Sequence, residues 1–186
     1  MAQWGAMEPR PEVVIEPYTA RWIKEFEGES EKLRSAFGEA LIEVHHIGST
    51  AVPGLAAKPV IDVLLVARSL AAADAKREVA EREGYRWEGE NGIPGRRYLV
   101  RLKPHGRRHH SHVHLFTEGD PQVGWHLRFR DYLRTHPGDA AAYGRLKAEL
   151  AKRFRTDRDA YQVGKEGFIE AALQKVDRSS IKPGGA

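Results

Sequence analysis

Residues 46–66 read HIGSTAVPGLAAKPVIDVLLV, and this segment decides the fold. An apolar stretch runs into a Gly48-Ser49 turn, small residues then lead to Lys58, and a second apolar stretch carries one acid, Asp62. Short apolar runs bounded by turn residues are typical of strands in a sheet. Gly48 lets the backbone approach a ligand closely, Ser49 adds a hydroxyl and Lys58 adds a cation. Three parts of a phosphate site therefore stand together in the sequence.

Asp62 interrupts the apolar run VIDVLLV. A carboxylate is costly to bury there without a cation or a donor beside it, so we expect Asp62 to have such a partner. The alternative is a strand-end carboxylate that backbone donors satisfy. A Gly-Ser pair alone is usually only a turn. The strand before it, together with Lys58 and the Asp62 strand after it, favours a phosphate site.

Composition limits the classes of protein. The 186 residues, 41% of them hydrophobic, suit a single domain spanning residues 1–186. The chain has no cysteine, which excludes disulfides and zinc-thiolate sites and is typical of the cytoplasm. No apolar run is long enough to cross a bilayer, and residues 1–11 lack a secretory pattern. A formal charge of +4 suits a nucleotide better than a nucleic acid duplex.

The periodicity of apolar residues predicts an α+β domain. Alternating or continuous apolar runs indicate strands at residues 13–16, 41–47, 60–66, 85–88, 97–102 and 112–117. A helix ends at Gly38, and Ser69 begins a second. We therefore expect a mixed β-sheet flanked by helices in residues 12–118, a C-terminal helical segment in residues 121–178 and a tail from residue 179 to 186.

Histidines form a second candidate site. His112 and His114 are two residues apart on a predicted strand, so their side chains point to the same face. Paired imidazoles can hold a metal, bind phosphate when protonated, or act as acid and base. The alternative is that they only line a half-solvated sheet face. We expect His109 and His110, in the loop before this strand, at the surface.

Basic residues of the C-terminal helices form a third candidate site. Lys147 and Lys165 each follow a tyrosine, Tyr143 and Tyr161, by four residues, so each lysine shares a helix face with a ring. A ring can stack on a nucleotide base while the ammonium binds phosphate. Arg130, on an earlier helix, is a further candidate cation. The alternative is that these residues form a solvated flank.

Two loops of unusual composition lie between the later strands. Residues 89–97 are rich in turn residues and contain one acid and two arginines, and residues 105–110 are strongly basic. Either loop is placed to border a pocket. The candidate substrate-binding residues are Glu43, His46, Glu90, Arg96 and Arg97.

Several blocks of this sequence resemble a known family. They are residues 46–62, residues 89–96, His112-Val113-His114, residues 129–134, and Tyr161 with Lys165. In this order they resemble the signature blocks of the GrpB family, over residues 13–172. The resemblance implies the nucleotidyltransferase, polymerase-beta-like fold, with a nucleoside triphosphate such as ATP as substrate and Mg²⁺ as cofactor.

The resemblance also implies roles for individual residues. Gly48, Ser49 and Thr50 would hold the phosphates, and Asp62 would be the first metal-binding carboxylate. The fold places a second carboxylate two residues further on, where this sequence has Leu64. A two-metal mechanism needs bridging carboxylates. Because Leu64 is not an acid, three alternatives follow. The site could hold a single metal, it could take ligands from His112, His114 or Glu43, or it could bind Mn²⁺ in place of Mg²⁺.

The leading functional hypothesis is metal-dependent nucleotidyl transfer from a triphosphate to a small-molecule acceptor. Asp62, His112, His114 and Lys58 are the candidate catalytic residues, with Asp62 and the two histidines as metal ligands. The phosphates would be bound by Gly48, Ser49, Thr50, Lys58, Arg130, Lys147 and Lys165, and the base by Tyr161. The alternatives are an ATP-dependent ligase acting through an acyl-adenylate, a non-catalytic binder of a nucleotide or a coenzyme A-related ligand, and an RNA-binding module. The sequence leaves the acceptor and the oligomeric state open.

Overall fold

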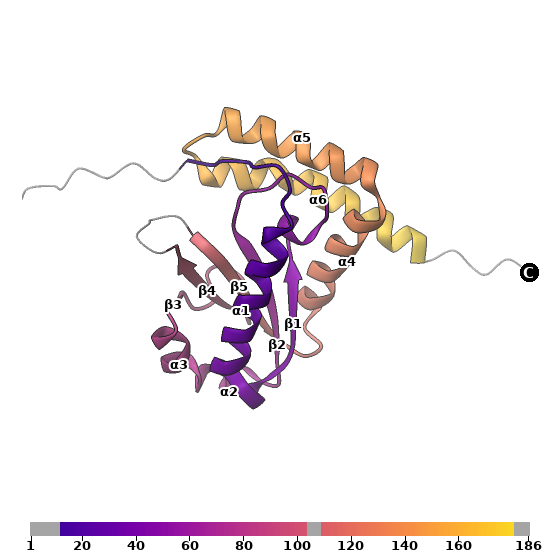
Figure 1. The fold of residues 1–186 in the computed structure, drawn as a ribbon. Helices are drawn as coiled ribbons and strands as arrows, with labels where there is room; N and C mark the ends of the chain where they lie inside the picture. Colours follow the sequence, from indigo (N-terminus) through magenta and orange to yellow (C-terminus); the bar gives the residue numbers. More distant parts are fainter. Residues whose placement is uncertain (1–11, 104–108, 181–186) are drawn as a thin grey trace, which may run out of the picture.

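A five-stranded mixed sheet forms the centre of the molecule (Figure 1). The computed structural model describes residues 12–103 and 109–180. The strands are β1 (Leu41–Ile47), β2 (Ile61–Ala67), β3 (Tyr85–Trp87), β4 (Arg97–Leu102) and β5 (His109–Thr117), in the order β1-β2-β5-β4-β3. The central pair β2 and β5 is parallel and the other pairs are antiparallel. The predicted mixed sheet is confirmed.

Helices surround this sheet. They are α1 (Arg21–Phe37), α2 (Leu70–Asp74), α3 (Arg77–Arg82), α4 (Pro121–Thr135), α5 (Pro137–Arg153) and α6 (Arg158–Ser180), with 3₁₀ turns η1 (Gly38–Ala40) and η2 (Ser49–Ala51). Gly38 ends α1 with a positive φ of 53°, and the Ser69 hydroxyl caps α2, both as expected. No helix among residues 12–103 and 109–180 is long and apolar enough to span a membrane.

The expected strand at residues 13–16 is absent. Only a single bridge joins Glu16 to Ala57 there. Pro17 follows at once, and proline has no N–H to extend a ladder, so the pairing stops after one bridge. The segment instead contacts the connection between α5 and α6, where Val13 N donates to Arg155 O at 2.8 Å.

The two faces of the sheet are covered by different elements. Side chains alternate along a strand, so Ile61, Val63 and Leu65 of β2 face α1 and join the main apolar core. Asp62 and Leu64 point to the opposite face, which α4 partly covers. In Figure 1, α5 and α6 lie across the end of the sheet where β1 ends and β2 begins. Asp62 therefore lies on the face and at the end of the sheet that the C-terminal helices approach.

A second apolar cluster joins the C-terminal helices to each other and to the connection before β2. It includes Val52 and Leu55 from that connection and Phe129, Tyr143 and Ala172 from the helices. Packing between α5 and α6 is close, because a Cβ placed on Gly164 would lie 2.5 Å from Leu150 Cδ2. This packing fixes α5 and α6 over the end of β2.

Candidate functional site

Asp62 lies in a row of paired residues that crosses the sheet. Ile47 of β1, Asp62 of β2, His112 of β5 and Val100 of β4 are direct neighbours in register. His112 Nδ1 is 3.2 Å from Asp62 Oδ1. The partner expected for Asp62 is therefore a histidine from the neighbouring strand.

The surroundings of Asp62 favour its ionised form. Burial by itself raises the pKa of the carboxyl, but the hydrogen bond and charge of His112, with smaller contributions from His114 and Lys58, outweigh it and lower the pKa to about 2. An ionised Asp62 accepts the Nδ1–H of His112, which leaves His112 Nε2 as an acceptor.

Gly48 lies directly against this carboxylate. Its φ is +68°, and a Cβ at this position would be 2.4 Å from Asp62 Oδ2. Only glycine combines this backbone conformation with the room that the carboxylate needs. The Gly-Ser turn and Asp62, which lie 13 residues apart in the sequence, thus meet in space.

A small cavity of about 90 Å³ opens beside Asp62, and we call it the lysine cavity. Its lining residues come from η2, the connection before β2, the starts of β2 and β5, and helices α5 and α6. They are Ser49, Thr50, Ala57, Lys58, Val60, Asp62, His112, Lys147, Tyr161, Gln162 and Lys165. The structure therefore brings together most of the predicted phosphate-binding residues from four distant segments of the chain.

Three lysines of this wall lie on aromatic rings. Lys58 Nζ and Lys165 Nζ are 5.1 and 4.8 Å from the centroid of the Tyr161 ring, and Lys147 Nζ is 4.7 Å from that of Tyr143. The predicted pairing of each helical lysine with the tyrosine one turn before it is confirmed. Lys147 is 2% exposed and donates to the Ala56 carbonyl at 2.6 Å.

These lysines have no matching acids. Within the described residues none of the three forms an ion pair with a carboxylate, and Asp62 is the one acid in the cavity wall. Burial, followed by the charge of Lys165, lowers the pKa of Lys147 to about 7. Burial, followed by the charge of Lys58, lowers the pKa of Lys165 to about 8, and burial also lowers the pKa of Lys58. An anion with several charges would stabilise the protonated form of all three.

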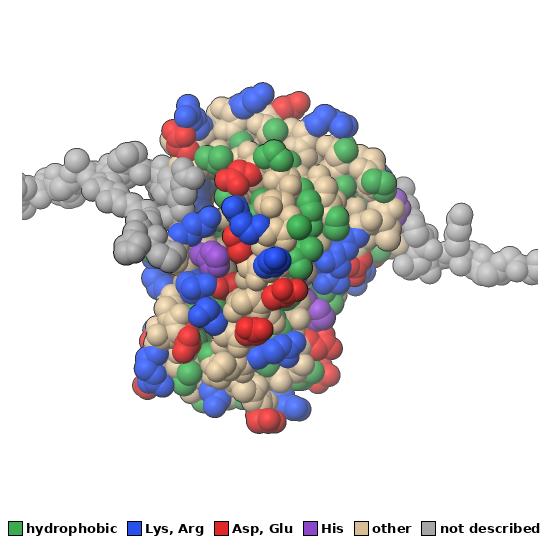
Figure 2. Space-filling view, viewed as in Figure 1, with side chains coloured by type: hydrophobic (Ala, Val, Ile, Leu, Met, Phe, Trp, Pro, Cys, Tyr) green, Lys and Arg blue, Asp and Glu red, His purple; other side chains and the backbone are tan. Residues whose placement is uncertain are grey.

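A larger cavity of about 520 Å³ adjoins the first and shares Lys58, His112 and Gln162 with it. We call it the outer cavity. The other residues that line it are Arg86, Glu88, Asn91, Tyr98, Val100, His109, Arg158 and Asp159. Figure 2 shows basic side chains gathered around a histidine on the face where the strand ends meet the C-terminal helices. The outer cavity is therefore lined by both basic and acidic side chains, and it adjoins the lysine cavity at Lys58 and His112.

His109 belongs to this site: it lies in β5 and not in a loop before the strand, and it is half-buried. Its Nδ1 is 2.6 Å from His112 Nε2, so Asp62, His112 and His109 form one hydrogen-bonded chain. Burial lowers the pKa of His109 to about 4, with a further contribution from the charge of His112. The pairing of β4 with β5 shifts after Arg101 and Ser111: Leu102 pairs with His109, which leaves His110 as an extra residue in β5. Strand alternation alone gives His109 and His112 opposite faces, so the sequence signal was misleading.

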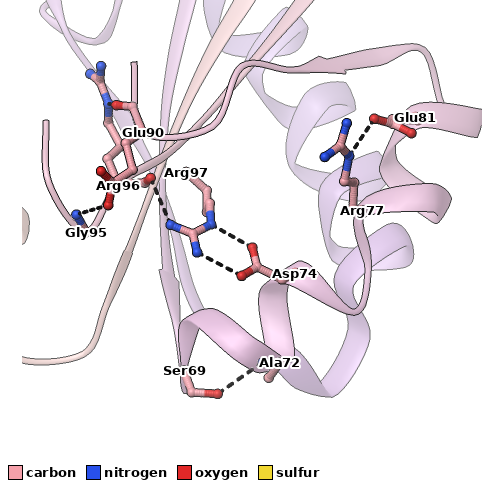
Figure 3. Close-up of polar contacts among 9 residues, drawn as sticks. All are labelled: Ser69, Ala72, Asp74, Arg77, Glu81, Glu90, Gly95, Arg96 and Arg97. Atoms are coloured by element: carbon pink, nitrogen blue, oxygen red, sulfur yellow. Dashed lines mark hydrogen bonds and ion pairs between the residues drawn. The ribbon is translucent and has the colours of Figure 1, made fainter. Parts of the chain in front are cut away.

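The candidate substrate-binding residues of the 89–97 loop are engaged in contacts within the loop and with α2. Glu90 Oε1 accepts the N–H of Gly95 at 2.7 Å, and Arg97 donates to both oxygens of Asp74 at 2.6 and 2.8 Å (Figure 3). Arg96 is buried, donates to the carbonyl oxygens of Glu90 and Asn91, and lies 4.7 Å above the Tyr98 ring. The loop is therefore held by its own contacts, and it reaches the outer cavity through Asn91 and Tyr98.

His114 lies behind the site rather than in it. It contributes to the wall of neither cavity, and its Nδ1 is 3.4 Å from an Arg96 nitrogen. Its ring also contacts the rings of Tyr98 and His126. Burial, followed by the charge of His126, lowers the pKa of His114 to about 3. This neutral ring packs beneath α4, so it is placed to support the site and not to contact a ligand.

Three other candidates lie outside the lysine cavity. His46 pairs with Val63 and so points to the opposite face, where its ring stacks on Phe26 at 4.6 Å and its Nε2 bonds Thr50 Oγ1. Glu43 is exposed and bonds His45. Arg130 pairs with Asp131 and donates to the His46 carbonyl. Strand alternation explains His46, and local ion pairing explains the other two.

Comparison with known proteins identifies the family. The model of the GrpB protein family matches residues 12–175. This chain belongs to the GrpB family. It is 41% identical over 170 residues to the UPF0157 protein YqkA of Bacillus subtilis (strain 168). The alignment covers 91% of this chain and 49% of YqkA, so the chain spans about half the length of that relative.

Solved structures support the same assignment. The crystal structure of the conserved protein GrpB from Enterococcus faecalis superposes with a TM-score of 0.83 at 36% identity, over 90% of this chain and 99% of that one. Cid1 in complex with its short product ApU superposes with a TM-score of 0.52 at 15% identity, over 75% of this chain and 43% of Cid1. The second likeness shows that this GrpB-family chain shares its fold with part of Cid1.

Relatives of this chain also include dephospho-CoA kinases. The dephospho-CoA kinase of Mycolicibacterium paratuberculosis is 31% identical over 200 aligned positions, which cover 94% of this chain and 49% of that protein. A segment like this GrpB-family chain therefore makes up about half of that enzyme.

The donors around Asp62 do not fit the metal site that the fold implies. Leu64, at the position of the second acid, is fully buried between Ile47 and Phe116 beneath α4. Across residues 12–103 and 109–180, no three histidine or carboxylate side chains gather closely enough to hold a metal. Asp62 is engaged with His112, and His114 with Arg96. The expectation of Mg²⁺ or Mn²⁺ on Asp62, His112 and His114 thus finds no support in this donor set, which lacks the oxygen ligands that these ions prefer.

Proposed function

We propose that the lysine cavity binds the phosphates of a nucleoside triphosphate, and that the protein transfers the nucleotidyl group to a small-molecule acceptor in the outer cavity. One observation carries the proposal: three lysines, of which Lys147 is buried and the other two are half-buried, face a single aspartate and have no carboxylate partner within the part of the chain that the structure describes. Buried charges are costly unless something pairs with them. A chain of phosphates supplies the missing negative charge within one ligand.

The arrangement of the two cavities suits an in-line transfer. An acceptor oxygen or nitrogen in the outer cavity attacks the α phosphorus, and the bond from that phosphorus to the oxygen bridging it to the β phosphorus breaks. Pyrophosphate leaves with the electron pair and remains beside the lysines, which stabilise its charge. The acceptor's proton passes to the histidine pair, in which Asp62 fixes the orientation of His112 and His109 extends the chain into the outer cavity.

Calorimetric titration with ATP tests the shared premise. Lys58→Met and Lys165→Met each remove one ammonium, and we expect each to weaken binding roughly 10- to 100-fold, the range for a lost charge-assisted contact. Lys152→Met is the matched control, because Lys152 lies exposed on the last turn of α5. Unchanged affinity in both cavity variants would remove the triphosphate from the proposal.

Two variants of this function share the binding step. With a carboxylate as acceptor the product is an acyl-adenylate, which an amine can capture to give an amide. With no transfer, the protein is a binder of a nucleotide or of a coenzyme A-related ligand, which the likeness to a dephospho-CoA kinase favours. Pyrophosphate release, measured across a set of small acids, alcohols and amines, distinguishes them. Release with any class supports transfer, and ATP binding without release supports the binder.

A further inference from the structure

We infer that the lysine cavity binds the free polyphosphate, so that its ammonium groups replace divalent cations in neutralising the ligand. The inference rests on the proposed function, because it assumes that polyphosphate is the occupant. It differs from what the nucleotidyltransferase fold implies, in which metal ions bridge the carboxylates and the phosphates.

The charges of the cavity wall argue for this substitution. Lys58, Lys147 and Lys165 supply three basic groups and Asp62 supplies one acid. A divalent cation entering with the ligand would lie among ammonium groups that already repel one another, as their mutual effects show. Complexation also removes as many negative charges from the polyphosphate as the ion carries. The free ligand carries more negative charge, so the ammonium groups attract it more strongly than the metal complex.

The positions that a metal would need are occupied by other contacts. Leu64 fills the second-acid position with a side chain that is fully buried under α4. Asp62 Oδ1 faces His112, and its Oδ2 lies against Gly48. The lysines, in contrast, are held toward the cavity by fixed partners, Lys147 by the Ala56 carbonyl and the other two by the Tyr161 ring. The wall is built to present ammonium groups.

The role of Asp62 changes with this inference. A metal-holding carboxylate strengthens the binding of a metal-bound nucleotide, whereas a carboxylate that faces a free polyphosphate repels it. Asp62 here orients His112 and limits how tightly the phosphates are held. The two roles predict opposite effects of neutralising this side chain.

Titration of the intact protein with ATP and with inorganic tripolyphosphate, at constant ionic strength, tests the inference. One buffer contains EDTA and the other excess Mg²⁺. We expect both ligands to bind in EDTA, with affinity equal to or up to roughly tenfold tighter than in Mg²⁺. Binding that is lost in EDTA and restored by Mg²⁺ would overturn the inference and leave the proposed function standing. Absence of binding in both buffers would overturn both.

Asp62→Asn supplies the second test, with opposite expectations for the two roles. In EDTA we expect this variant to bind tripolyphosphate more tightly than the wild type, because a repelling charge is gone. Weaker binding by a variant whose circular dichroism spectrum and melting are unchanged would contradict the inference. The comparison of buffers on the wild type does not depend on how this variant folds.

Discussion

Gly48 and Asp62 show how the absence of one methyl group shapes the lysine cavity. At Gly48 a positive φ coincides with a carboxylate oxygen 2.4 Å from where a Cβ would be. We expect the added Cβ of Gly48→Ala to push the Gly-Ser turn and Asp62 apart, and this distortion of the cavity wall to weaken ATP binding by more than roughly tenfold, in addition to a backbone cost of about 1 kcal/mol. The measurements are calorimetric titration and urea denaturation.

Gly54→Ala is the control for this prediction. Gly54 has a φ of +79°, but open space surrounds the position of its Cβ. The substitution should therefore cost a similar free energy of unfolding while leaving ATP affinity unchanged. Equal losses of affinity in the two variants would show that backbone strain, and not the contact with Asp62, is responsible.

Lys165 should strengthen ligand binding while lowering the stability of the folded protein. Its pKa is about 8 in the folded protein and 10.5 in the absence of the fold, so the unfolded state binds more protons between these values. Charging Lys165 in the folded protein therefore lowers the free energy of unfolding. This destabilisation is complete below about pH 8 and declines as the pH rises. We expect Lys165→Met to melt at a higher temperature than wild type at pH 7, with the difference shrinking by pH 9.5. Calorimetric melting at both pH values checks this, and a lower melting temperature at pH 7 would contradict it.

At the scale of elements, packing between α5 and α6 depends on Gly164. A Cβ there would lie 2.5 Å from Leu150, while a Cβ on Gly167 of the same helix meets nothing within 4 Å. Overpacking costs about 1–3 kcal/mol, whereas alanine gains about 1 kcal/mol of helix propensity over glycine. Chemical denaturation should therefore show that Gly164→Ala destabilises the protein and Gly167→Ala stabilises it. Stabilisation by both would mean that Leu150 moves away freely.

Element bounds were predictable where local pattern and turn residues agree. The strands at residues 41–47 and 97–102 have the predicted bounds, because each is a short apolar run ended by turn residues. The position of His109 was not predictable, because it depends on an irregularity in β5 itself, where the pairing with β4 skips His110. Strand alternation did predict that Asp62 and His112 have side chains on a definite face, but only the register of β2 against β5 makes them neighbours.

At the scale of the whole molecule, Glu29 joins α1 to three strands. This 1% exposed carboxylate accepts from the Tyr85 hydroxyl at 2.9 Å, from the Ser111 hydroxyl at 2.7 Å and from Arg101. Glu29→Ala leaves these donors without their acceptor, and we expect a loss of about 3–5 kcal/mol in the free energy of unfolding. Glu31→Ala, on the exposed side of the same helix, should change it by less than about 0.5 kcal/mol. Denaturant titration of both variants checks the difference.

The cavity as a whole could not be derived from the sequence without the family resemblance. Its segments are separated by more than a hundred positions, and no local pattern states that α5 and α6 close over the start of β2. What the sequence did indicate was the chemistry of each part: a close-approach glycine, a buried acid, and lysines one turn from tyrosines. Long-range packing of the second apolar cluster supplies the rest.

The lysine cavity draws its wall from both the sheet and the C-terminal helices, with Lys58 and Asp62 on one side and Lys147 and Lys165 on the other. An occupant that contacts both sides would thus link the sheet to the C-terminal helices. Tripolyphosphate at a hundred times its dissociation constant should add about 2.7 kcal/mol to the free energy of unfolding. Amide protons of α5 and α6 should then exchange more slowly, since the ligand ties these helices to the sheet.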